Sequence, residues 1–98
     1  MSAHNDHMLA TLARIGAGRE CDVVLQDKAV SRLHAEVRAA RGGVLVVDLD
    51  SRNGTRVNNA MIKEAFVPVE GRFVVGETTI RVIDAGRDGR LVKKSRLL

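Results

Sequence analysis

Hydrophobic residues along this chain occur in short runs, several of which alternate with polar positions. The runs cover residues 9–15, 23–25, 35–39, 44–49, 66–69, 73–75, 79–83 and 91–92. Runs of this length are typical of β-strands, and no segment keeps the 3.6-residue spacing of an amphipathic helix over about 11 residues. The pattern therefore predicts a chain built from short strands.

Turn-forming residues separate these runs. Gly, Asn and Asp gather at residues 16–18, 41–43, 51–54, 58–59, 69–71, 75–77 and 85–89. These residue types favour tight turns because they adopt backbone conformations that other residues avoid, or because their side chains form hydrogen bonds with the nearby backbone. Strands that follow one another about ten residues apart, with such turns between them, indicate an all-β fold. We predict an antiparallel β-sandwich.

The size and composition fit one globular domain, since the chain has 98 residues, of which 45% are hydrophobic and 29% charged. No apolar run approaches the roughly 20 residues of a membrane-spanning helix, so no membrane partner is expected. The N-terminus lacks a secretory signal, and the single Cys21 cannot form an internal disulfide, which favours the cytoplasm. We expect residues 1–8 to be a disordered leader or a remnant of expression, and residues 9–84 to form the domain.

The positive charge is concentrated at one end of the chain. Residues 87–98 carry the whole net charge of +4, because the charges of residues 1–86 cancel. The chain has two aromatic residues, Phe66 and Phe73, which are too few to form a platform for stacked bases. No nucleic-acid partner is expected. Residues 85–98 are interpreted as a basic tail or as a substitute edge strand.

Three predicted loops are rich in hydrogen-bonding groups: residues 16–22, 27–34 and 48–59. Guanidinium, hydroxyl and amide groups beside glycines suit a phosphate dianion, which accepts hydrogen bonds from every direction. The same residue types also form ordinary solvated turns, which composition alone favours. The candidate side chains are Arg19, Ser31, Arg32, Arg52, Asn53 and Thr55.

Two sequence blocks decide between these interpretations. Residues 22–35, DVVLQDKAVSRLHA, and residues 47–58, VDLDSRNGTRVN, closely resemble the forkhead-associated (FHA) domain, whose pattern contains S-R-x-H and S-x-N-G-T at this separation. The resemblance extends from Ile15 to about Val82. It implies a β-sandwich that binds a phosphothreonine-containing protein or peptide through its loops, without catalysis. We expect neither a cofactor nor a metal. A degenerate domain that mediates phosphate-independent interaction or oligomerisation is the alternative.

The resemblance also implies roles for individual residues. Ser31 would donate its hydroxyl to the phosphate, and Arg32 would contribute charge there or along the peptide. Arg52 would touch the phosphate or its neighbour, and Asn53 would hydrogen-bond the peptide backbone. Structural support of the loops is implied for His34, Ser51, Gly54 and Asn58.

The sequence departs from the family pattern in three places. The family's first-loop arginine, five residues before the position of Asp22, is Ala17 here; Arg19 is predicted to replace it, and a degenerate site is the alternative. The family's Gly after V-N is Asn59, which tolerates the left-handed conformation, so the hairpin is expected to survive. Few residues precede Ile15, so we expect the opening edge strand to be missing. The uncovered edge could then pair with a second copy as a homodimer.

A hydrolase is the competing class of function. Ser31 and His34 could combine with an acid, Asp27 or Asp48, as nucleophile and base. However, an odd separation in an extended segment sends the two side chains to opposite faces, so direct proton transfer is not expected. Cys21 has no histidine nearby in the sequence and is interpreted as a packing residue. We predict that the protein is not an enzyme.

Overall fold

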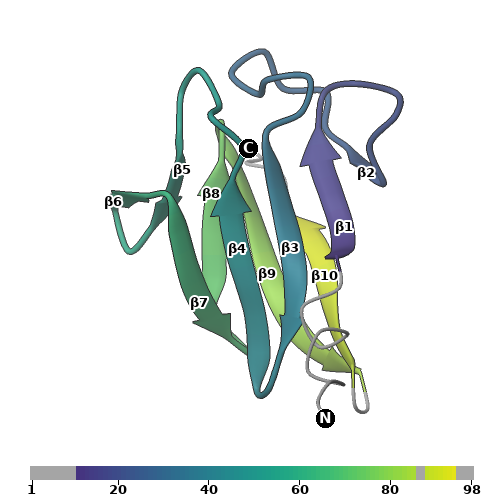
Figure 1. The fold of residues 1–98 in the computed structure, drawn as a ribbon, viewed down its shortest axis with the longest axis vertical. Helices are drawn as coiled ribbons and strands as arrows, with labels where there is room; N and C mark the ends of the chain where they lie inside the picture. The colour runs from purple at the N-terminus through teal and green to yellow at the C-terminus, as the bar shows by residue number, and fades with distance from the viewer. Residues whose placement is uncertain (1–10, 86–87, 95–98) are drawn as a thin grey trace, which may run out of the picture.

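The computed structural model describes the backbone of residues 11–85 and 88–94 and the side chains of residues 13–83 (Figure 1). Within these ranges the chain forms ten strands in two five-stranded sheets and contains no helix. The predicted all-β sandwich is therefore confirmed. The predicted leader, residues 1–8, lies outside the described residues, and so does any strand before Thr11.

The two sheets interleave distant parts of the sequence. The first sheet has the spatial order β2 (Val23–Val24), β1 (Thr11–Gly16), β3 (Ala35–Ala40), β4 (Gly43–Asp48) and β7 (Glu64–Pro68). The second has the order β10 (Asp88–Lys94), β9 (Thr78–Ala85), β8 (Arg72–Val75), β5 (Thr55–Val57) and β6 (Ala60–Ile62). All neighbouring strands are antiparallel except β1 and β2, which are parallel. Because β1 and β2 run in the same direction, the loop that joins them must return alongside β1 and does not form a tight hairpin.

Part of the predicted tail lies in the second sheet. Strand β10 pairs with β9 along its whole length, from Asp88 opposite Ala85 to Lys94 opposite Thr79. It occupies one edge of this sheet, and β6 occupies the other. Residues 86–87 and 95–98 lie outside the described part of the chain.

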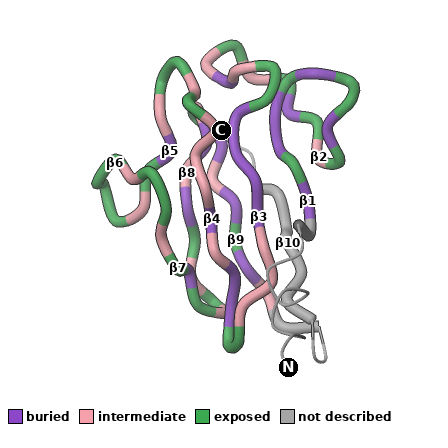
Figure 2. The backbone as a smooth tube through the Cα atoms, viewed as in Figure 1, coloured by how far each residue is buried: buried purple, intermediate pink, exposed green. Residues whose placement is uncertain are grey.

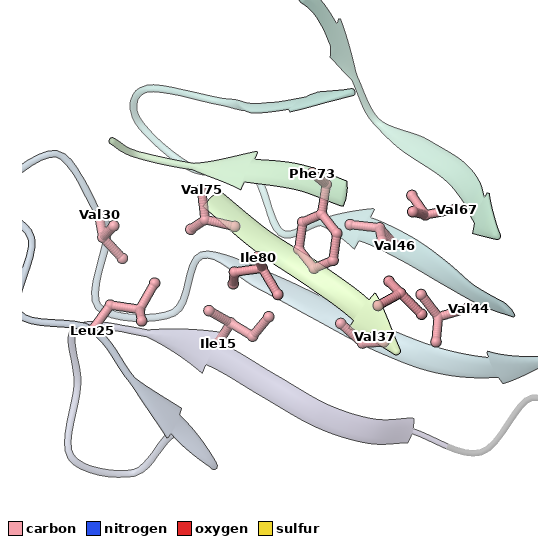
Figure 3. Close-up of a cluster of buried hydrophobic side chains, with 11 residues drawn as sticks. Ile15, Leu25, Val30, Val37, Val44, Val46, Val67, Phe73, Val75 and Ile80 are labelled. Atoms are coloured by element: carbon pink, nitrogen blue, oxygen red, sulfur yellow. The ribbon is translucent and has the colours of Figure 1, made fainter. Parts of the chain in front are cut away.

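The core lies between the sheets, where alternate residues of the facing strands point inward. Figure 3 shows the Phe73 ring reaching from β8 toward the side chains of the opposite sheet. The spacing follows the two-residue period of a strand, so Val44 and Val46 are fully buried while Leu45 between them is partly exposed. The buried cluster contains Ile15, Leu25, Val30, Val37, Val44, Val46, Val67, Phe73, Val75, Ile80 and Val82.

The hairpin between β5 and β6 is present, with Val57 opposite Ala60. Its two central residues, Asn58 and Asn59, both have positive φ, 53° and 68°. This is the turn that matches the twist of two antiparallel strands, and asparagine is among the few residues that enter it without a large penalty. The replacement of the family's glycine by Asn59 therefore leaves the hairpin intact.

Three connections meet at one end of the sandwich. The loops that follow β1, β2 and β4 lie there together, and the β3–β4 hairpin closes the opposite end (Figure 1). Figure 2 shows many exposed residues along the loops at this end, whereas buried residues recur along β3, β4 and β9 below them. The three loops that the sequence singled out thus share one surface.

Candidate functional site

A pocket of about 180 Å³ lies between these loops. Of the predicted binding residues, Ser31, Arg32, Arg52 and Asn53 line it, whereas Arg19 does not. Lys28, which the sequence analysis did not single out, lies in the lining. The pocket is lined by Ala17, Lys28, Ala29, Val30, Ser31, Arg32, Arg52 and Asn53.

The first loop forms one wall of the pocket through its backbone. Ala17 N–H donates to the carbonyl of Ser31 at 2.9 Å, and Gly18 N–H donates to that of Arg32 at 3.0 Å. A Cβ at Gly16 would collide with the Arg32 carbonyl oxygen. Glycine is therefore needed here because the two backbones touch.

Cys21 supports the same contact from behind. Its thiol is buried and donates to the carbonyl of Arg32 at 3.1 Å. Burial raises the pKa of the Cys21 thiol, and the neighbouring Glu20 carboxylate raises it further. The protonated thiol is a poor nucleophile, which agrees with the interpretation of Cys21 as a packing residue.

Ser31 connects two loops at the pocket. Its Oγ accepts a hydrogen bond from the backbone N–H of Arg52 at 3.0 Å. Because the Oγ acts there as acceptor, the hydroxyl keeps its own proton to donate. Asn53 makes a second link, since its Nδ2 donates to the carbonyl of Ala29 at 2.9 Å. These bonds place the Ser31 hydroxyl beside Arg52 and Asn53.

His34 braces the two loops from inside. The imidazole is fully buried, and its Nδ1 accepts a hydrogen bond from Ser31 N–H at 3.0 Å. The ring proton must then sit on Nε2, which lies 2.9 Å from the carbonyl oxygen of Gly54 and donates to it. Both ring nitrogens are engaged by the backbone.

This geometry corrects one argument about Ser31 and His34. The two residues between them form a bend, not an extended strand, so alternation of faces does not separate the two side chains. What keeps His34 from acting as a base for the Ser31 hydroxyl is that Nδ1 already accepts the Ser31 N–H and Nε2 carries the proton.

The turn that presents Arg52 and Asn53 is held by Asp48. Its carboxylate accepts hydrogen bonds from the backbone N–H of Ser51 at 3.1 Å, the hydroxyl of Ser51 at 2.6 Å and the hydroxyl of Thr55 at 2.8 Å. The Ser51 Oγ in turn accepts from Gly54 N–H at 2.9 Å. Gly54 has a φ of 86°, which favours glycine.

The charge of Asp48 depends on those bonds. Partial burial disfavours the carboxylate, but the hydrogen bonds from Ser51 and Thr55 outweigh it and lower the pKa of Asp48 below its ordinary value. Thr55 is fully buried, so its hydroxyl needs the Asp48 acceptor. Thr55, a candidate from composition, therefore supports the turn and does not line the pocket.

Asp27 fixes the loop that carries Ser31. One carboxylate oxygen accepts from Ala29 N–H at 2.9 Å, and the other accepts from Glu77 N–H and the Thr78 hydroxyl, both at 2.8 Å. Sequence reasoning considered Asp27 only as a catalytic acid. The local bond to Ala29 is typical of an Asp that starts a turn, but the bonds to the β8–β9 turn arise from tertiary packing.

The cations around the pocket differ in their partners. Arg32 forms an exposed ion pair with Glu20, with 3.3 Å between Nη2 and Oε1. Within residues 13–83, no carboxylate forms an ion pair with Lys28 or Arg52. Lys28 and Arg52, which have no ion-pair partner among the described residues, line the pocket and contribute positive charge to it.

A metal site and a membrane-spanning helix are two further features that the described residues could contain. Among them, no three His, Cys, Asp or Glu side chains gather in a way that could hold a metal ion. The same part of the chain contains no helix long and apolar enough to cross a membrane.

Comparison with known proteins identifies similar domains. The family model described as the cytoplasmic domain of the inner membrane component of T3SS matches residues 6–86. Among curated proteins, the glycogen accumulation regulator GarA of Mycolicibacterium smegmatis is 47% identical over 63 residues, which are 62% of this chain and 40% of that protein. The chain spans between 10% and 40% of the length of the first curated relatives it matches.

Solved structures with the same fold include FHA domains. One, from a study of phosphothreonine-dependent FHA domain interactions, is 36% identical with a TM-score of 0.68. The match covers 74% of this chain and 76% of the chain in that structure. Another is the FHA domain of FhaA in complex with the intracellular domain of Rv3910. It is 36% identical with a TM-score of 0.62, and the match covers 67% of this chain and 72% of the FhaA chain.

Proposed function

Since the chain belongs to the forkhead-associated family, we propose that it is a non-catalytic module that docks a phosphothreonine-containing protein or peptide in the pocket at its loop end. The observation that carries this proposal is the Ser31 hydroxyl, which keeps its proton and lies in a pocket that Lys28 and Arg52 also line. Phosphothreonine-dependent interaction in a solved relative supports it. We further propose that it acts in a regulator in the bacterial cytoplasm. Its similarity to a bacterial regulator supports this, and so does the family model, whose description is of a cytoplasmic domain.

Each pocket residue has a proposed task. Ser31 donates its hydroxyl proton to a phosphate oxygen, and Arg52 supplies charge from the neighbouring turn. Asn53 has its Nδ2 committed to Ala29, so its Oδ1 is the atom that accepts from a peptide N–H. Arg32 contributes charge at the rim. The assignment of Arg19 to the phosphate is a competing prediction, which binding by an Arg19→Ala variant tests. The expectations of a homodimer and of no nucleic-acid or membrane partner also stay predictions.

The proposal predicts phosphate-dependent binding. Calorimetric titration with a peptide selected from an oriented phosphothreonine library, and with its unphosphorylated twin, is expected to show micromolar affinity for the first alone. Ser31→Ala should weaken binding about tenfold, because it removes one hydrogen bond to a charged group. Thr79→Ala removes a hydroxyl from the outer face of the second sheet and serves as the matched control.

Equal affinity for the two peptides would contradict the proposal. It would favour the phosphate-independent alternative, which sedimentation of the free protein would then test by detecting a dimer.

The Glu20–Arg32 ion pair leads to a second expected result. Glu20→Gln should tighten phosphopeptide binding about threefold, because it releases Arg32 toward the phosphate and removes a negative charge beside the pocket. Glu70→Gln breaks the exposed pair with Arg81 and is the matched control. Titration of both variants with the same phosphopeptide measures the effect. Unchanged or weaker binding by the Glu20 variant would show that the pair does not compete with the ligand.

A further inference from the structure

Lys28 lies in the pocket lining although the family pattern assigns it no role. It follows Asp27 directly and occupies the turn that leads to Ser31. Its side chain is exposed, and no carboxylate of residues 13–83 forms an ion pair with it. The ammonium group is therefore available to a ligand in the pocket.

The opposite wall of the pocket offers little to an anion. Ala17 has no polar side chain, and its backbone N–H is already bonded to the Ser31 carbonyl. Arg19 is exposed outside the lining, and the charge of Arg32 is shared with Glu20. The first loop therefore places no cation in the pocket, and a phosphate bound there would need its charge balanced from the Lys28 side and the Arg52 side.

The base of the Lys28 side chain is held in place. Asp27 accepts hydrogen bonds from Ala29 N–H through its carboxylate and from Val30 N–H through its carbonyl, both at 2.9 Å. The same carboxylate holds the loop to the β8–β9 turn. Lys28 thus projects from a fixed turn, and only its flexible four-carbon stem must order when a ligand binds.

We propose that Lys28 is a phosphate-binding residue that supplies the cation missing from the first loop. This inference rests on the proposed function and adds a recognition residue to it. Lys28 and Arg52 would balance the charge of the phosphate, and the Ser31 hydroxyl would fix its position. An ammonium is a compact point charge with rotatable donors, whereas a guanidinium imposes a planar fork. The orientation of the phosphate then depends on Ser31 and the loop backbone, not on the cation.

The test compares variants of the full chain with one phosphothreonine peptide and its unphosphorylated twin. Lys28→Met keeps the length of the side chain and removes the charge, so it should weaken phosphopeptide binding about tenfold, the usual worth of one charge-assisted hydrogen bond. Lys28→Arg should retain affinity within about threefold, because it restores the charge. Lys63→Met, at an exposed lysine between β6 and β7, is the control.

Three further readouts separate recognition from structure. The melting temperature of Lys28→Met should equal that of the wild type, because the side chain is exposed and forms no ion pair with any carboxylate of residues 13–83. Its affinity for the unphosphorylated peptide should not change. Arg19→Ala should bind the phosphopeptide like the wild type.

Two results would overturn the inference, and they are distinguishable. If the wild type prefers the phosphopeptide but Lys28→Met binds it equally well, Lys28 has no part in recognition while the proposed function stands; a loss in Arg19→Ala would then assign the cation to the first loop. If the wild type binds both peptides equally, the proposed function and the role of Lys28 are both wrong.

Discussion

Replacing His34 with alanine is expected to lower the free energy of unfolding by about 3 kcal/mol and to reduce phosphopeptide binding below detection. The imidazole is fully buried, and its removal leaves a cavity together with two unsatisfied backbone groups, Ser31 N–H and the Gly54 carbonyl. These groups belong to the two loops that form the pocket. Both loops would therefore lose their alignment even where the sandwich stays folded.

Thermal denaturation and titration measure the two effects. For a domain of this size the melting temperature should fall on the order of 15 °C, at about 4–8 °C per kcal/mol. His34→Asn places an acceptor near the position of Nδ1 and should spare the Ser31 bond, whereas His34→Gln reaches toward Gly54. A His34→Ala variant as stable as the wild type would show that the two hydrogen bonds of the imidazole contribute little to stability.

Replacing Asp48 with alanine is expected to cost about 2–3 kcal/mol. The carboxylate accepts three hydrogen bonds, and the fully buried hydroxyl of Thr55 has no other acceptor among the described residues. The turn that presents Arg52 and Asn53 should loosen as a result. Chemical denaturation measures the loss of stability, and titration with the phosphopeptide measures the loss of affinity. Asp50→Asn is the matched control, because Asp50 is an exposed aspartate of the same segment whose φ of 60° asparagine also tolerates.

The lowered pKa of Asp48 predicts that the stability of the fold depends on pH. The pKa of Asp48 is lower in the folded protein than its ordinary value, because the bonds from Ser51 and Thr55 outweigh the effect of burial. Its charged form therefore stabilises the fold above the unfolded-state pKa of about 3.9, and this contribution is lost as the pH falls through the folded-state pKa. The difference in melting temperature between wild type and Asp48→Asn should shrink from pH 7 to about pH 3. A difference that stays constant would contradict this assignment.

Much of the fold was predictable because its strands bury one face. The runs at 35–39 and 44–49 became β3 and β4 within a residue at each end, since alternation and the Gly42–Gly43 turn mark both strands. Strand β6 was not predicted as a run. Its residues Ala60, Met61 and Ile62 are not buried, so its pairing with β5 follows from the Asn58–Asn59 turn and not from hydrophobic spacing.

The site was predictable where spacing along the chain determines it. Ser31 and Asn53 stand at fixed places in two sequence blocks, and the structure brings both to one pocket. Lys28 was missed because a lysine in a turn is usually solvated, and only the packing of the loop places it in the lining. Arg19 was predicted from its nearness to the vacant arginine position; Ala17 lines the pocket and Arg19 does not, and a contact between Arg19 and a bound phosphate stays a prediction.

The hydrogen bonds of the Asp27 side chain affect the order in which parts of the protein can fold during synthesis. Its carboxylate bonds to Glu77 and Thr78, which follow it by 50 and 51 positions in the sequence. A chain emerging from the ribosome releases the loop with Ser31 well before the turn that holds this loop in place. Contacts between such distant positions form late in folding, because the intervening chain must first be ordered. If the proposed function is correct, we therefore expect a growing chain to bind a phosphorylated partner only after the second sheet has formed.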